Sequence, residues 1–281
     1  MNLDNLYYSK QDSSKAIESE VVQANKPDEF AEIGGMGADD TDYTKGEPFI
    51  DTGIVFILSG GSEREKDYFR PLKIDKQIHN VKIAFRSKKG QGLKPYELAS
   101  LASEFVSSKS FTTEDNISYH IEKGDIIYLI QDVDEFGLEL TKQLKSDYDK
   151  SSIHWIISNP AFEIWLFYHY NDDTSLLKEG LSKSERDRSN WLKEYLNEII
   201  PGGIKTTQAF HSVDIAIKNS RNNYIEKDGI PDVFSTQMHI VAEKIISMLG
   251  EAEFKAMNER RNNRIAAFKK QTEENPKRQN H

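Results

Sequence analysis

The sequence contains no cysteine, which excludes disulfide bonds, thiolate zinc sites and cysteine nucleophiles and is typical of a reducing compartment. It also lacks any apolar run near the roughly 18 residues that a membrane-spanning helix needs. The longest apolar runs, such as 54–58, have the length of a strand. The first residues show no basic region followed by an apolar block, so no secretory signal is expected. These absences predict a cytoplasmic protein without a membrane partner.

Positive charge is scarce as well. The 281 residues include 37 Lys and Arg against 46 Asp and Glu, which gives a net charge of −9. Residues 1–50 carry four lysines and eleven acids, whereas 251–281 carry eight Lys or Arg and five acids. The composition therefore shows no basic patch, the usual sign of nucleic-acid binding. A nuclease is still compatible with this charge, because metal-binding carboxylates add negative charge and bound cations attract phosphate.

Composition and periodicity divide the chain into four segments. Residues 1–50 are polar, acidic and without periodicity, so they are expected to form a flexible N-terminal arm or a segment that orders against a partner. Residues 51–175 are expected to form an α/β core, and 176–250 a helical portion that completes the domain. Residues 251–281 are expected to form a charged C-terminal helix or tail.

Within the core, strand and helix patterns alternate. Short apolar runs predict strands at 53–58, 81–85, 125–130 and 153–158, and helical periodicity predicts helices at 95–106 and 137–148. This alternation predicts an α/β fold with a mostly parallel sheet and helices on both faces. After residue 170 the strand patterns stop. Apolar stripes then predict a helical C-terminal portion, with helices around 191–199, 210–217 and 238–249 and a glycine cap at Gly250.

Asp132 and Asp134 follow the most strand-like run of the sequence. Ligand sites in open α/β sheets form at the carboxyl ends of strands. Residues two apart on an extended chain point to the same side, with side chains roughly 6–7 Å apart. Two carboxylates so placed can share Mg²⁺ or Mn²⁺, with water and substrate phosphate as further ligands. Aspartates at strand ends also serve as helix caps or solvated turns, so the pair by itself leaves both roles open.

A glycine-rich turn follows the first predicted strand. Gly60 and Gly61 precede an expected helix start, where backbone N–H groups can receive an anion. The Gly-Lys-Ser/Thr ending of a Walker loop is missing, so no nucleotide-binding loop is expected. Glu63 and Glu65 either interact with the helix dipole in the first turn or reach the aspartates, if the two strand ends are neighbours.

The third element of interest is the segment 158–170. Asn159 is expected to cap a helix that begins at Pro160, and the helix is apolar almost all round and therefore buried. Glu163 lies within this helix, and a buried carboxylate needs a cation, a metal or a hydrogen-bond donor. A structural ion pair and a role in the site are both open for Glu163. His169 by itself is expected to be structural, with substrate binding as the alternative.

These three elements, in this order, resemble the RloB family. The family pattern has a strand followed by Gly-x-x-Thr-Glu-x-x-Tyr-Phe, a strand with Asp-x-Asp, and then Ser-Asn-Pro-x-Phe-Glu-x-Trp-Leu with a histidine. The resemblance covers roughly residues 53–250. The matching residues are Gly61, Arg64, Glu65, Tyr68, Phe69, Asp132, Val133, Asp134, Ser158, Asn159, Pro160, Phe162, Glu163, Trp165, Leu166 and His169, and Lys205 falls where the family has a lysine.

The resemblance implies a Toprim-like fold and Mg²⁺- or Mn²⁺-dependent cleavage of RNA or DNA phosphodiesters. It also implies a role in bacterial antiviral defence, often beside an ATPase partner. By similarity, Asp132 and Asp134 would bind the metal, and a glutamate near the first strand would be the general acid/base. Further candidates are Glu163 and Lys205 for catalysis, and Gly60, Gly61, Asn159 and His169 for phosphate or substrate binding.

The end of the first strand departs from the family pattern. A Toprim-like site usually has Glu-Gly at this point, whereas this chain has Ser59-Gly60-Gly61. Either Glu63 or Glu65 replaces the missing acid in a nuclease, or the protein is a catalytically quiet sensor or scaffold subunit. A third class, the phosphotransferases, would need a nucleotide-binding motif that the sequence lacks.

Overall fold

The structure, a computed structural model, describes residues 53–133, 136–200 and 202–274. Of the two units into which the chain divides, Met1–Pro48 and Phe49–His281, the described residues all belong to the second. The expected arm at 1–50, the metal-ligand candidate Asp134 and the end of the expected C-terminal tail lie outside the described residues.

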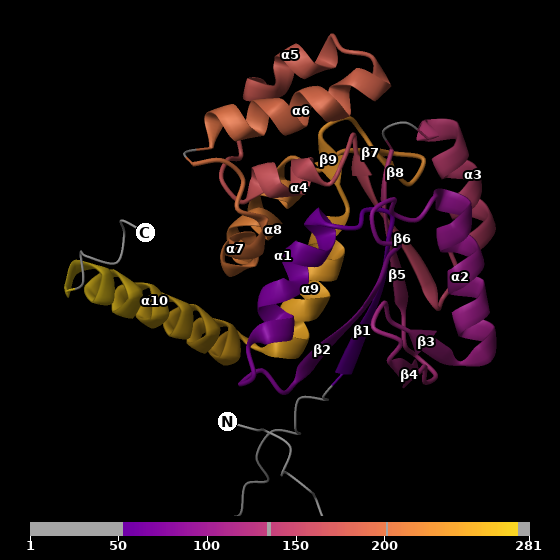
Figure 1. The fold of residues 1–281 in the computed structure, drawn as a ribbon. Coiled ribbons are helices and arrows are strands. Elements are labelled where there is room, and N and C mark those ends of the chain that lie inside the picture. The colour runs from indigo at the N-terminus through magenta and orange to yellow at the C-terminus, as the bar shows by residue number, and fades with distance from the viewer. Residues whose placement is uncertain (1–52, 134–135, 201, 275–281) are drawn as a thin grey trace, which may run out of the picture. The chain divides into compact units, whose positions relative to one another are not determined.

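The second unit is built on a five-stranded sheet with the order β2-β1-β5-β6-β9 (Figure 1). The four longer strands are parallel, and β9 pairs antiparallel with β6. The strands are β1 (Gly53–Ser59), β2 (Val81–Arg86), β5 (Ile127–Asp132), β6 (Ile153–Asn159) and β9 (Ser235–Thr236). The mostly parallel sheet predicted from the alternation of strand and helix patterns is therefore confirmed.

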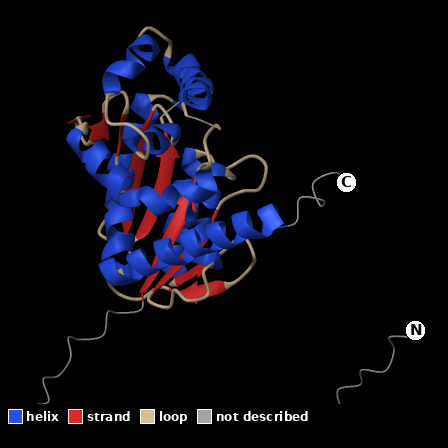
Figure 2. Ribbon diagram, turned by 90° about the vertical axis from the view of Figure 1, so that its left-hand side faces the viewer, coloured by secondary structure: helices blue, strands red, loops and turns tan. Residues whose placement is uncertain are grey.

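Helices cover both faces of this sheet (Figures 1 and 2). Successive strand residues point to opposite faces, so Val55 and Ile57 enter one hydrophobic core while Phe56 and Leu58 enter the other. The first core also receives α1 (Arg64–Ile74), α4 (Glu163–Tyr168), α6 (Glu185–Ile199), α8 (Val213–Asn222) and α9 (Met238–Leu249). The second core receives α2 (Pro95–Ser108) and α3 (Leu138–Tyr148). Burial on both faces explains why these strands are continuous apolar runs.

The predicted helices are present with small changes in their bounds. The longer ones are α1 (Arg64–Ile74), α2 (Pro95–Ser108), α3 (Leu138–Tyr148), α4 (Glu163–Tyr168), α6 (Glu185–Ile199), α8 (Val213–Asn222), α9 (Met238–Leu249) and α10 (Glu251–Glu274). Shorter helical turns are η3 (Thr174–Leu177), α5 (Lys178–Leu181), α7 (Thr206–Ala209) and η4 (Phe210–Ser212). Gly250 ends α9 with a φ of 79°, as expected of a glycine cap. None of the described helices has the length and apolar character needed to span a membrane.

The helical C-terminal portion predicted after residue 170 is confirmed, but it also contains short strands that the sequence did not indicate. Besides β9, the C-terminal half contains a two-stranded antiparallel sheet of β7 (Glu226–Lys227) and β8 (Ile230–Pro231). In the N-terminal half, β3 (Ser110–Thr112) and β4 (Ser118–His120) form a second antiparallel pair. Two-residue strands are too short to produce an alternating pattern. The residues of β9 are also polar. Thr236 is buried, and its hydroxyl has a hydrogen-bond partner in the hydroxyl of Ser158, 2.8 Å away.

The helix expected to begin at Asn159 and Pro160 begins instead at Glu163. Asn159 is the last residue of β6, where it pairs with Ser235, and its side-chain amide donates to the Pro231 carbonyl at 2.9 Å. The Asn159–Pro160 peptide bond is cis. Because the Asn159 backbone belongs to the sheet and its side chain is bound elsewhere, it does not cap the helix. The prediction that this helix is buried is confirmed, since all six residues of α4 are buried.

Candidate active site

A cavity of about 440 Å³ lies at the carboxyl ends of β1 and β5. The chain leaves β1 to form β2 on one side, whereas β5 lies on the other side, so the strand order reverses at this point. Such a reversal opens a crevice in which α/β proteins bind ligands. The Gly60 amide donates to the Ile130 carbonyl at 2.8 Å, and the Leu93 amide donates to the Gly60 carbonyl at 2.9 Å, which holds the first turn against its neighbours.

Four carboxylate residues line this cavity: Glu63, at the N-cap of α1, and one residue from each of three elements. Glu65 comes from the first turn of α1, Asp132 from the last position of β5, and Glu163 from the first position of α4. The expectation that a glutamate following the first strand lies beside the strand-end aspartate therefore agrees with the cavity lining. Serine, glutamine, arginine and lysine residues complete the polar part, and the described lining includes no histidine or cysteine.

Glu65 is an acid whose pKa is shifted by burial. Only 5% of the residue is exposed, and burial raises the pKa of its carboxyl to about 7. A hydrogen bond with its own backbone opposes this rise, the negative charge of Glu163 adds to it, and the cations Lys193 and Arg64 oppose it. The carboxylate lies directly over Gly61, where a Cβ atom would collide with it. The glycine at 61 therefore makes room for the Glu65 side chain.

Glu163 forms an ion pair with Arg64, the first residue of α1. The Glu163 side chain is 3% exposed, whereas that of Arg64 is 38% exposed. The sequence predicted that a buried acid on this apolar helix must find a partner, and that prediction is confirmed. The pair joins α1 to α4 inside the cavity, so Glu163 is both structurally paired and placed beside the other acids.

The cavity also contains cations for which the sequence predicted no role in the site. Arg64, Lys94 and Lys193 all line it, and Lys193 comes from α6, in the helical C-terminal half. Lys193 is half-buried and lowers the pKa of Glu65. No local signal marks Lys193, because its role depends on how α6 packs over α4. Positive groups beside carboxylates allow the cavity to receive a phosphate group.

The structure describes only one of the two aspartates that were predicted to bind a metal ion. β5 ends at Asp132, which lines the cavity, and Asp134 lies outside the described residues. Among the residues whose positions are described, no group of three or more His, Asp or Glu side chains is arranged to hold a metal ion. Metal binding by the two aspartates remains a prediction.

The other predicted site residues fall into two groups. Gly60, Gly61 and Glu63 line the cavity with the acids. Asn159 and Lys205 do not; Lys205 instead lines a separate cavity of about 290 Å³ with His211 and Arg261.

His169 also lies outside the lining of the acidic cavity. It is buried, its Nδ1 lies 3.1 Å from the Ser212 hydroxyl, and its ring packs against Tyr68 and Trp165. Burial lowers the pKa of His169 to about 3, so the ring is neutral near pH 7. These contacts agree with the structural role that the sequence favoured for this histidine.

Fold and cavity together define an α/β protein with an acidic site at the strand-order reversal of a mostly parallel sheet. Residues 55–245 match the family model described as RloB-like protein. Because the match spans more than half of the chain, the protein belongs to the RloB-like family. No curated protein and no solved structure matches the chain at a significant level.

Proposed function

We propose that this protein is a metal-dependent, Toprim-like nuclease that hydrolyses phosphodiester bonds in RNA or DNA. The observation that carries the proposal is the convergence of Glu65, Asp132 and Glu163 on one cavity that also contains cationic side chains. Membership of the RloB-like family is consistent with a protein associated with antiviral defence. A nuclease that acts as the effector of such a system accounts for both the acids and the cations.

The oxygen-rich lining of the cavity suits a hard divalent cation. Asp132 supplies one carboxylate, and the proposal assigns the second to Asp134. Mg²⁺ and Mn²⁺ need few protein carboxylates, because waters and substrate phosphate oxygens provide the remaining ligands. Two protein carboxylates are therefore sufficient to bind such an ion. When bound, the ion would polarise the scissile phosphate and activate a water molecule.

Glu65 is the proposed general base. A base is most effective when its pKa is near the working pH, and burial brings the Glu65 carboxyl to about 7. Glu63 is exposed at the N-cap of α1, whereas Glu65 is buried in the cavity. Of the two glutamates that follow the first strand, Glu65 is thus the better replacement for the acid missing from Ser59-Gly60-Gly61.

Arg64, Lys94 and Lys193 are the proposed phosphate-binding groups. An arginine can donate two parallel hydrogen bonds to phosphate oxygens, and lysines act as point charges. In the free protein Arg64 is bound to Glu163. Binding of a phosphate would place the Arg64 guanidinium between two anionic partners, and the 38% exposure of its side chain leaves room for the second.

The test is a cleavage assay with purified protein. Labelled transfer RNA, single-stranded RNA and plasmid DNA are incubated with Mg²⁺, Mn²⁺ or EDTA. We expect cleavage that needs the divalent ion and is lost in Asp132→Asn. Asp214→Asn, on the exposed surface of α8, is the matched control. Cleavage that persists in EDTA would contradict the proposal, as would cleavage by Asp132→Asn at the wild-type rate.

A catalytically quiet subunit is the second candidate. The observation that favours it is the absence of an acid at the end of β1, where Ser59 is fully buried. Such a subunit would sense or scaffold within a defence complex that contains an ATPase. No cleavage of any of the three substrates, together with ion binding that is unaffected in Asp132→Asn, would favour this candidate.

In either case we propose an ATPase as a partner, because the sequence has no nucleotide-binding loop of its own. Affinity purification of a tagged copy from the native host, followed by mass spectrometry, tests this part of the proposal. A protein that is recovered alone and cleaves at full rate as a monomer would contradict it.

A further inference from the structure

A second cavity of about 1050 Å³ lies beside the acidic cavity. The two cavities share Ser62, Glu63 and Leu93 in their linings, so they are continuous at the start of α1. Between β2 and α2, the loop 87–94 contributes to the lining of both. A ligand larger than one phosphate can therefore extend from the acidic cavity along this loop.

This loop region is cationic in a chain whose net charge is −9. The segment 86–96 contains four Lys or Arg residues and no acid. Lys88 is paired with Glu97 at 3.3 Å. Within the described part of the chain, Lys89 and Lys94 form no ion pair, and both are exposed. The two lysines are thus available to an anionic ligand.

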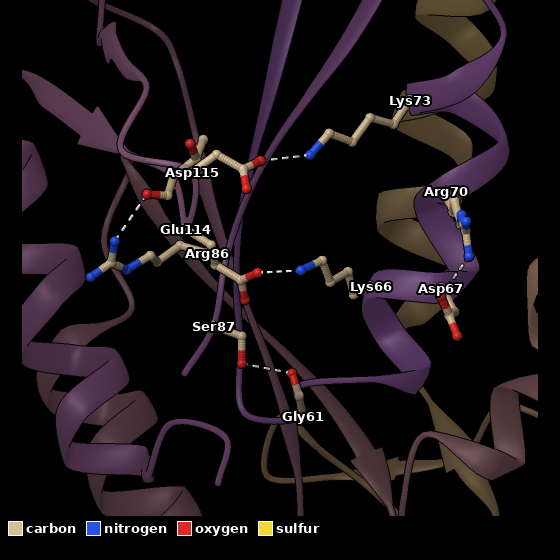
Figure 3. A network of polar contacts seen from close by, with 10 residues as sticks. Gly61, Lys66, Asp67, Arg70, Lys73, Arg86, Ser87, Glu114 and Asp115 are labelled. Carbon is tan, nitrogen blue, oxygen red and sulfur yellow. Dashed lines mark hydrogen bonds and ion pairs between the residues drawn. The ribbon is translucent and has the colours of Figure 1, made fainter. Parts of the chain in front are cut away.

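The acids that line the second cavity are mostly neutralised by neighbouring cations. Figure 3 shows Lys66 bound to Glu114 and Lys73 bound to Asp115, at 2.9 Å for the second pair. Asp67 and Glu97 also have cationic partners, in Arg70 and Lys88 respectively. Because these acids are paired, their repulsion of an approaching phosphate is reduced.

Tyr96 adds an aromatic surface to the same cavity. It lies in the first turn of α2, lines the second cavity, and is 59% exposed. Exposed aromatic rings next to lysines are the elements that proteins use to stack unpaired bases and follow a phosphate backbone. The bases of a duplex are already stacked on each other, so an exposed tyrosine favours a single strand.

The loop is fixed to the turn that carries the acidic cavity. The Ser87 hydroxyl donates to the Gly61 carbonyl at 2.8 Å, as Figure 3 shows. The Leu93 amide donates to the Gly60 carbonyl at 2.9 Å. These bonds hold both ends of the loop against Gly60 and Gly61. Phosphates bound along the loop therefore lie in a fixed relation to the acids.

We propose that the second cavity binds a single strand of nucleic acid that flanks the phosphate held in the acidic cavity. Lys89 contacts the backbone in the second cavity, Lys94 contacts it in the adjoining acidic cavity, and Tyr96 stacks on a base. The inference rests on the proposed nuclease function and narrows its substrate to single-stranded RNA or DNA, or to a single-stranded region of a folded RNA.

The experiment measures binding separately from cleavage. In the full-length Asp132→Asn chain with Mg²⁺, fluorescence anisotropy follows a labelled oligouridine, an oligothymidine and a duplex of the same length. The test variants are Lys89→Ala/Lys94→Ala, Tyr96→Ala and Tyr96→Phe. The matched control is Lys123→Ala/Lys150→Ala, two exposed lysines that precede β5 and β6 at the opposite edge of the sheet.

We expect single strands to bind more tightly than the duplex. The double lysine variant should reduce the slope of log Kd against log salt by about 1.4, since each contact with a single strand contributes about 0.7. Loss of stacking in Tyr96→Ala should weaken binding by about 5- to 100-fold, and Tyr96→Phe should retain it. The control variant should bind like the parent, and all variants should melt like it.

Three results would overturn the inference: a duplex that binds as tightly as the single strands, alanine variants of Lys89, Lys94 and Tyr96 that bind like the parent, or no binding of any oligonucleotide. The outcome is independent of hydrolysis. Suppose that binding depends on Lys89, Lys94 and Tyr96 but the wild-type chain never cleaves. This result would support the binding role of this cavity and contradict the nuclease proposal. Cleavage by the wild type, with unchanged binding in the variants, would contradict this cavity alone.

Discussion

Arg64 and Glu163 are the first residues of α1 and α4, and their ion pair joins the two helices inside the acidic cavity. The pair links the glycine-rich turn after β1 to the segment after β6, which are almost one hundred residues apart in the sequence. It therefore fixes the relative positions of Glu65 and Glu163, the two buried glutamates of the cavity. Stability and activity are expected to depend on it differently.

The first prediction concerns the stability that this pair provides. Arg64→Met leaves the Glu163 carboxylate buried without its cation, so we expect the free energy of unfolding to fall. Breaking a fully buried pair costs about 3–5 kcal/mol. Because solvent screens the partly exposed Arg64, we expect about 1–3 kcal/mol here. Urea denaturation measures the change.

The double variant Arg64→Met/Glu163→Gln is the control for this prediction. Removing both charges should restore most of the stability, because no charge then remains buried without a partner. If the two single losses simply add in the double variant, Arg64 and Glu163 are not energetically coupled and the prediction is wrong.

The second prediction is that Asp132 binds a divalent cation. Isothermal titration with Mn²⁺ should show binding in the wild type and none in Asp132→Asn, because the substitution removes a carboxylate at the end of β5. Glu163→Gln should lower affinity or activity by roughly 10- to 100-fold if Glu163 supports the metal ligands. Asp214→Asn should behave like the wild type, and equal binding by Asp132→Asn would rule out this site.

The sequence predicted the parts of this site that depend on strand ends. Asp132 and the turn at Gly60 and Gly61 each follow an apolar run, and parallel strands bring their carboxyl ends to one edge of the sheet. The sequence also predicted that Glu163 would be paired, since a buried charge must be compensated. These predictions succeeded because local pattern and burial determine them.

The parts that were missed depend on tertiary packing. Lys193 reaches the cavity only because α6 packs beside α4, and nothing in its own segment indicates this. Asn159 was expected to cap a helix, but pairing with Ser235 extends β6 through it. That pairing involves a two-residue strand 76 positions away, which no local pattern can predict. Lys205 was assigned by similarity to the family, and the structure places it at another cavity.

The third prediction is that Glu65 controls the pH dependence of cleavage. As a general base it must be ionised, so the cleavage rate should rise with pH through about 7, the pKa of its carboxyl. Glu65→Gln should remove this rise and lower the rate by roughly 100-fold or more. Pre-steady-state cleavage rates measured across this pH range provide the comparison.

Glu63→Gln is the matched control for Glu65→Gln, because Glu63 is a neighbouring glutamate that is exposed at the same cavity. It should retain the rise in rate through pH 7. If both variants cleave at the wild-type rate, neither glutamate replaces the acid missing after β1, and the catalytic role of Glu65 must be given up.

The fourth prediction uses the same carboxyl to test the structure without any substrate. In the unfolded chain the Glu65 carboxyl ionises around its ordinary pKa of 4.5, whereas in the folded chain it retains its proton up to about 7. Folding therefore favours the protonated form. The favourable contribution is complete below pH 4.5 and is lost as the pH rises through 7.

One pKa unit corresponds to about 1.4 kcal/mol, so this contribution is on the order of 3 kcal/mol. Glutamine has no charge to bury, so its stability does not depend on pH in this way. The stability of Glu65→Gln relative to the wild type should therefore increase by this amount as the pH is raised from 4.5 to 8. Other titrating groups cancel in the difference between the two proteins. Urea denaturation at several pH values measures it, with Glu63→Gln as the control at an exposed glutamate. A constant difference between wild type and Glu65→Gln would mean that burial does not raise the pKa of Glu65, and the assignment of this residue as a base near pH 7 would lose its physical reason.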